Sequence, residues 1–103
     1  MKKTVIIVDD HHLFRESIIR ILALDGTYEV VAEGSNGKEA IQLVEMYKPD
    51  LLLLDINMPG KNGVEATEEI SQLSPDTKIL VLSIHDDESY VTHVLKKGAD
   101  GYL

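Results

Sequence analysis

The chain has 103 residues, 44% of them hydrophobic and 27% charged, which is the composition of one globular domain with a modest core. Its net charge of -8 argues against direct binding of this segment to DNA or RNA. Cysteine is absent, which excludes disulfides and thiolate metal sites and fits the cytoplasmic location that we expect. No apolar stretch reaches membrane-spanning length, and we expect neither a membrane contact nor a signal peptide.

The first third of the chain predicts a strand, a helix and a second strand. The apolar run at 4–9 is typical of a strand buried on both faces. Residues 12–23 predict a helix, and residues 28–34 predict an edge strand, because two glutamates interrupt its apolar character. The helix is expected to place four apolar side chains on one face, namely Phe14, Ile18, Ile21 and Leu22.

Capping sequences indicate where the next two helices begin. Asn36 is followed three residues later by Glu39, and the two side chains of such a capping box satisfy free backbone amides. The helix that it opens is expected to stop before Pro49, since proline disfavours helix at the residue preceding it. Asn62 and Glu65 form a second box of the same kind, which opens a third helix.

The rest of the chain continues the alternation. Residues 51–55 and 78–83 predict strands, residues 88–97 predict a helix that ends at Gly98, and residues 100–103 begin a last strand. This pattern predicts an α/β fold with a doubly wound parallel sheet covered by helices on both faces. By analogy we expect a flavodoxin-like order, which places the ends of the first and third strands side by side.

Acidic residues end both of the most apolar strands. Asp9 and Asp10 follow the first strand, and Asp55 ends the third. Because the carboxyl ends of neighbouring parallel strands meet at one edge, we expect the three carboxylates to converge. They would repel one another unless a cation neutralised them, and oxygen ligands of this kind suit Mg²⁺. The pattern predicts a metal site that presents Asp55 to a phosphoryl group.

The order and spacing of six motifs resemble the receiver domain of a two-component response regulator of the NarL/FixJ class. The resemblance spans the whole chain. Its motifs are IVDDH at 7–11, DINMP at 55–59, NGVEAT at 62–67, LSIHDD at 82–87, YVTH at 90–93 and GADGYL at 98–103. Each motif alone is weak, and the specificity lies in the set.

The resemblance implies a phosphorylation switch rather than a turnover enzyme. Asp55 would be the phosphoacceptor, attacking the phosphohistidine of a sensor histidine kinase. Asp10, Asp55 and the backbone carbonyl of Asn57 would bind Mg²⁺ directly, and Asp9 would act through water. The metal would neutralise charge on the transferred phosphoryl oxygens.

The resemblance also implies residues that read out the phosphoryl group. Ser83 would hydrogen-bond it, and Tyr102 would then turn inward as the switch aromatic. Asn57 and His85 stand where family members tune the lifetime of the aspartyl phosphate.

Simpler interpretations remain open for several of these residues. Asp9 and Asp10 could form a turn or a helix cap. Ser83 could be a solvated strand end, Tyr102 a half-buried edge aromatic, and His85 part of an acidic helix start. His11 and His12 resemble a metal-binding pair, but neighbouring helical residues point in different directions, which favours a solvated helix start.

Two parts of the family pattern are missing. The family carries a lysine on its last strand, followed by a final helix, and neither is found before Leu103. We therefore expect residues 1–103 to be a receiver domain incomplete at its C-terminal end, with a DNA-binding domain downstream. An apolar face left uncovered in this way predicts self-association, with a homodimer as the expected form.

The sequence leaves two other functions to compare with this one. The first is a stand-alone relay or scaffold receiver, which the sequence downstream of Leu103 would distinguish from a transcription regulator. The second is a Mg²⁺-dependent phosphohydrolase with an aspartyl-phosphate intermediate. That class needs a second aspartate two residues after the nucleophile, and Asn57 occupies the position.

Overall fold

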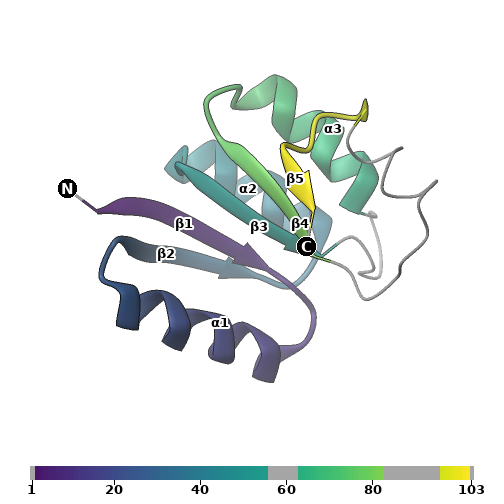
Figure 1. Ribbon diagram of the computed structural model, residues 1–103. Coiled ribbons are helices and arrows are strands. Elements are labelled where there is room, and N and C mark those ends of the chain that lie inside the picture. The colour runs from purple at the N-terminus through teal and green to yellow at the C-terminus, as the bar shows by residue number, and fades with distance from the viewer. Residues whose placement is uncertain (1, 56–62, 83–95, 103) are drawn as a thin grey trace.

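In the computed structural model, residues 2–55, 63–82 and 96–102 are described. They form a parallel sheet of five strands with helices on both faces (Figure 1). The strands are β1 (Lys3–Val8), β2 (Tyr28–Gly34), β3 (Leu51–Asp55), β4 (Lys78–Leu82) and β5 (Gly101–Tyr102). The helices are α1 (His12–Asp25), α2 (Gly37–Tyr47) and α3 (Gly63–Leu73). The predicted fold class is confirmed.

The strand order is β2-β1-β3-β4-β5, which confirms the flavodoxin-like order and places β2 at an edge. Strands β1 and β3 are neighbours at the centre, in a register that pairs Val5 with Leu51 and Val8 with Leu54. One step further along both strands stand Asp9 and Asp55. The register of the two central strands therefore delivers the two acidic residues to the same point of the sheet edge.

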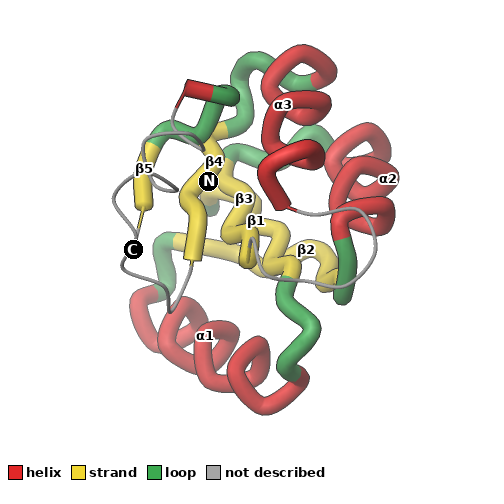
Figure 2. Tube along the Cα trace, turned by 90° about the vertical axis from the view of Figure 1, so that its right-hand side faces the viewer, coloured by secondary structure: helices red, strands yellow, loops and turns green. Residues whose placement is uncertain are grey.

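The sheet separates two layers of side chains. Helix α1 covers one face, and α2 and α3 cover the other (Figure 2). Because side chains alternate along a strand, Ile6 and Val8 enter the larger core under α2 and α3, whereas Val5 and Ile7 enter the smaller core that faces α1. All four of these side chains are fully buried, as the apolar run predicted.

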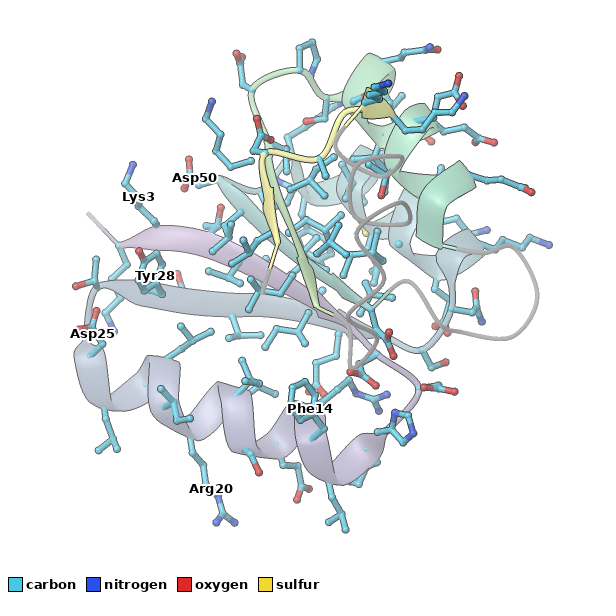
Figure 3. The ribbon with its side chains drawn as sticks, turned by 45° about the vertical axis from the view of Figure 1, so that its right-hand side comes forward. Lys3, Phe14, Arg20, Asp25, Tyr28 and Asp50 are labelled. Carbon is cyan, nitrogen blue, oxygen red and sulfur yellow. The ribbon has the colours of Figure 1, made fainter. Side chains whose placement is uncertain are left out.

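Helix α1 lies on the sheet differently from the prediction. Ile18 and Leu22 pack against the smaller core as expected, together with Ile19, but Phe14 is 43% and Ile21 62% exposed. Apolar residues occur all around this helix, so their periodicity does not define one apolar face. Packing against the sheet decides which of them are buried. Figure 3 shows the opposite face, with Arg20 pointing away from the sheet.

Helix α2 begins and ends as predicted. The Asn36 side chain accepts a hydrogen bond from the Glu39 backbone N–H at 2.9 Å. The Glu39 carboxylate in return accepts bonds from the hydroxyl and the backbone N–H of Ser35, which lower the pKa of Glu39. The helix ends at Tyr47, and its C-cap residue Lys48, directly before Pro49, has a left-handed backbone with φ 46°. The second predicted box begins at Asn62, which lies outside the described residues.

A polar clamp joins the amino ends of the two central strands. The backbone N–H and the hydroxyl of Thr4 donate to Asp50 Oδ2 at 2.8 and 3.2 Å, and Asp50 N–H donates back to Thr4. Figure 3 shows Asp50 with Lys3 and Tyr28 at this end of the sheet. The clamp sets the β1–β3 register from the end opposite to the acidic residues.

Within the part of the chain that is described, no helix is both long enough and apolar enough to cross a membrane.

Candidate functional site

The acidic residues predicted from the strand ends lie together at the carboxyl edge of the sheet. Asp9 directly follows β1 and is 3% exposed, and Asp55 ends β3 and is 7% exposed. Asp10 is more open to solvent, with 30% of its side chain exposed. Carboxylates buried to this degree are rare in proteins unless partners compensate their charge. The arrangement is therefore a buried acidic cluster, in which Asp9 also makes the turn bond that the simpler interpretation predicts, since its Oδ1 accepts the His11 backbone N–H.

His11 is part of this cluster. Its Nδ1 lies 3.0 Å from Asp9 Oδ1 and 3.0 Å from Asp10 Oδ1, and its backbone N–H donates to Asp9 Oδ1 at 2.8 Å. The hydrogen bond to Asp9, together with the charges of Asp10 and Asp9, raises the pKa of His11 above its usual range. When protonated, the imidazole offsets part of the carboxylate charge.

The sequence-based interpretation of the two histidines is right but incomplete. They do point in different directions, and His12 is a solvated residue whose Nε2 lies 3.0 Å from Glu16 Oε1 in the next turn of α1. His11 is solvated as well, with 72% of its side chain exposed, but it also contacts the acidic pair. It stands at the N-cap position, still outside the helix, where an extended backbone with φ -97° and ψ 100° turns its ring toward the carboxylates.

Arg15 holds the acidic loop in place, and sequence reasoning missed it. Its guanidinium donates to the backbone carbonyl of Asp9, and its Nε donates to Glu33 Oε1 at 3.2 Å. The loop after β1 is thereby tied to the end of β2. A signal was available, since Arg15 stands three, four and seven residues before the sheet-facing positions 18, 19 and 22.

The donor atoms fit a divalent cation. One ligand atom each from Asp9, Asp10, His11 and Asp55 lies within 4.8 Å of all the others. Three of the four are carboxylate oxygens, which hard cations such as Mg²⁺ prefer. The predicted convergence of the three carboxylates is confirmed by this geometry, and their roles in binding and catalysis stay predictions.

For the other predicted site residues, the described part of the structure does not show a position relative to the cluster. Asn57, Ser83 and His85 lie outside the described residues, so their assigned roles stay predictions. Tyr102 is described in its backbone alone, which pairs with Val81 where β5 joins β4. The predicted strand at 78–83 is seen as β4 up to Leu82.

Comparisons with known proteins bear on the same edge of the sheet. The family model described as response regulator receiver domain matches residues 5–103. The transcriptional regulatory protein DegU of Brevibacillus brevis is 63% identical over 102 residues, which cover 99% of this chain and 43% of the relative. The chain thus spans less than half the length of that curated relative.

Solved structures agree in fold. The signal receiver domain of NarL from Mycobacterium tuberculosis superposes with a TM-score of 0.94 at 38% identity, covering 99% of this chain and 82% of that one. A response regulator from Burkholderia pseudomallei, whose structure contains a phosphorylated aspartic acid and a calcium ion, is 26% identical with a TM-score of 0.87. The match covers 99% of this chain and 59% of that protein.

Proposed function

The chain belongs to the response regulator receiver domain family, and on that premise we propose that Asp55 is the phosphoacceptor of a two-component signalling switch. A carboxylate oxygen of Asp55 attacks the phosphorus of a phosphohistidine on a sensor histidine kinase. The new oxygen–phosphorus bond forms as the nitrogen–phosphorus bond breaks, and the kinase histidine leaves. The observation that carries this proposal is the convergence of Asp55 with Asp9 and Asp10 at the ends of the two central strands.

The proposal includes a Mg²⁺ ion at the acidic cluster. Asp10, Asp55 and the backbone carbonyl of Asn57 would hold it directly, and Asp9 would hold it through water. When bound, Mg²⁺ supplies positive charge for the phosphoryl oxygens and lines up donor and acceptor. Asp9 contributes orientation as well, because its Oδ1 already accepts the His11 backbone N–H and so shapes the loop that carries Asp10.

Readout of the phosphoryl group is assigned from the family resemblance. Ser83 hydrogen-bonds the phosphoryl oxygen and Tyr102 moves inward in response. Asn57 and His85 tune how long the aspartyl phosphate lasts. The described backbone of Tyr102 lies beside β4, the strand that leads to Ser83, and this proximity supports a linked movement of the two.

The output that we propose is control of transcription through a DNA-binding domain downstream of this chain, in the cytoplasm. The name of the 63% identical relative, a transcriptional regulatory protein, supports it. A homodimer is part of the proposal, and the exposed Leu13, Phe14, Ile21 and Leu24 of α1 supply apolar surface for association. A stand-alone relay receiver is the alternative.

Phosphate incorporation tests the proposal directly. The protein is incubated with acetyl phosphate and Mg²⁺, and the product is mapped by mass spectrometry after trapping of the acyl phosphate. We expect incorporation at Asp55 alone, and its loss in Asp55→Asn. Asp25→Asn is the matched control, because Asp25 is an exposed carboxylate at the far end of α1. Incorporation into Asp55→Asn at the wild-type rate would show that the assignment is wrong.

A further inference from the structure

We propose that His11 supplies an imidazole nitrogen ligand to the cation at the acidic cluster, so that this site binds borderline transition-metal ions such as Co²⁺ more tightly than carboxylates alone would. The inference rests on the proposed function only in sharing its cation site. It concerns which metals the site accepts, whereas the proposed function concerns the transfer of a phosphoryl group to Asp55.

The spacing of the donor atoms carries the inference. In an octahedral site with metal–ligand distances of about 2.1 Å, adjacent ligands stand about 3.0 Å apart and opposite ones about 4.2 Å. His11 Nδ1 lies 3.0 Å from Asp9 Oδ1 and 3.0 Å from Asp10 Oδ1, contacts that a proton on the ring nitrogen bridges in the cation-free site. The same 3.0 Å is the separation of two adjacent ligands, so a cation that takes the place of this proton finds the ring nitrogen and Asp10 at ligand spacing. The largest separation within the four-atom cluster, 4.8 Å, exceeds the opposite-ligand distance only slightly. Small side-chain movements therefore suffice to bring His11 Nδ1, Asp10 and Asp55 around one ion, with Asp9 reaching it through water.

The backbone presents the ring to the cluster. His11 is the N-cap residue of α1, yet its side chain makes no capping bond to the helix. Its backbone N–H is bound to Asp9 Oδ1 at 2.8 Å, which holds the start of the side chain beside that carboxylate. The side chain is 72% exposed, so the cluster is open to solvent on the His11 side. An ion can enter there without a rearrangement of the sheet.

Ligand chemistry then predicts a selectivity. Mg²⁺ is a hard ion that binds oxygen and keeps several waters, so an added imidazole changes its affinity little. Imidazole suits Co²⁺, Ni²⁺ and Zn²⁺, whose affinities for nitrogen-containing sites exceed those of earlier divalent ions of the series. His11 should therefore raise the affinity for Co²⁺ and leave that for Mg²⁺ nearly unchanged.

The neighbouring histidine provides a matched control. His12 has the same chemistry, but its Nε2 lies 3.0 Å from Glu16 and its Nδ1 lies 3.3 Å from an Arg15 nitrogen. The guanidinium beside it opposes the approach of a cation. If a transition metal nevertheless bound to the His12–Glu16 pair, His12→Ala and not His11→Ala would weaken binding.

The test is calorimetric titration of the protein with Co²⁺ and separately with Mg²⁺ at one fixed pH, for wild type, His11→Ala and His12→Ala. We expect His11→Ala to weaken Co²⁺ binding roughly tenfold or more, the scale on which changes around a metal site act, with Mg²⁺ affinity within about twofold. His12→Ala should match wild type for both ions. The visible absorption of bound Co²⁺ should also change in His11→Ala, since a nitrogen ligand is lost.

Three results would overturn the inference: unchanged Co²⁺ affinity in His11→Ala, equal weakening of Co²⁺ and Mg²⁺, or loss of Co²⁺ binding in His12→Ala alone. Equal weakening would mean that His11 only orders the carboxylates. If His11→Ala fails to fold, His11→Gln is measured in its place, because glutamine keeps a polar side chain but lacks the imidazole ring. Phosphate incorporation at Asp55 with Mg²⁺ is measured on wild type in parallel, so failure of the proposed function is seen separately from failure of the His11 inference.

Discussion

Gly98 stands at a point of close contact on which the C-terminal segment depends. Its φ of +123° lies in a region that other residues rarely adopt, and a Cβ built there would lie 2.6 Å from both Cβ and Oγ of Ser71 on α3. Two residues later the chain bonds to β4, where Asp100 N–H donates to the Ile79 carbonyl at 2.8 Å and Asp100 Oδ2 accepts from Ile79 N–H at 2.9 Å. Gly98→Ala should disturb this connection.

The magnitude follows from two contributions. Holding alanine in this backbone conformation costs about 1–3 kcal/mol, and overpacking against a helix that cannot easily move costs about 1–3 kcal/mol more. The sum of about 2–6 kcal/mol is a large share of the roughly 5–15 kcal/mol expected for the free energy of unfolding of a domain of this length. We expect Gly98→Ala to be severely destabilised.

Urea denaturation followed by circular dichroism measures the loss of stability. If the slope of the free energy of unfolding against urea concentration is the same in both proteins, the shift of the urea midpoint gives the change in stability. Gly26→Ala is the control, because Gly26 has a φ of +76° and nothing within 4 Å of its built Cβ, so only a backbone cost of about 1–2 kcal/mol applies. If Gly98→Ala lost no more stability than Gly26→Ala, the close contact with Ser71 would carry no energy and the reasoning would be refuted.

Two further predictions concern the ends of the central strands. The hydrogen bond from the Thr4 backbone N–H holds the pKa of Asp50 below its usual range. The ionised Asp50 should therefore stabilise the fold fully above the ordinary carboxyl pKa of about 3.9. This stabilisation should be lost as the pH falls through the lowered pKa of the folded state. Asp50→Asn should accordingly unfold at lower urea than wild type near neutral pH, with the gap narrowing in acid, and a constant gap would contradict this. At the other end, Arg15→Met keeps the apolar stem but loses the charged bond to the Asp9 carbonyl, and should cost about 1.5–3 kcal/mol by urea denaturation; an unchanged urea midpoint would refute that role.

Much of the site could be predicted from sequence because strand ends are locally encoded. Two apolar runs that each stop at an aspartate identify buried strands and their carboxyl ends, and parallel pairing then brings Asp9 and Asp55 together. The Asn36 cap was predictable for the same reason, since its partner is only three residues away. Both inferences needed only a short-range sequence pattern. The meeting of Asp9 and Asp55 needed in addition one general rule of sheet geometry.

The missed features depend on long-range packing. Contact with the smaller core decides which face of α1 packs on the sheet. Ile19 therefore lies among the packed residues, whereas Phe14 and Ile21, which were predicted there, are exposed. Arg15 acquires its role from Glu33 on β2, eighteen residues away. The placement of His11 depends on a loop conformation that periodicity does not describe.

The order of the strands makes formation of the acidic cluster part of the pairing of the two central strands. The four residues of the cluster all lie within the first 55, and they meet where β1 pairs with β3, while β4 and β5 lie further out on one side of β3. Carboxylate repulsion thus opposes the pairing of the two central strands. If that pairing belongs to the transition state, a cation that relieves the repulsion accelerates folding and leaves the unfolding rate nearly unchanged. The metal of a signalling site would in this way act as a folding cofactor, a property that stopped-flow refolding with and without Mg²⁺ measures.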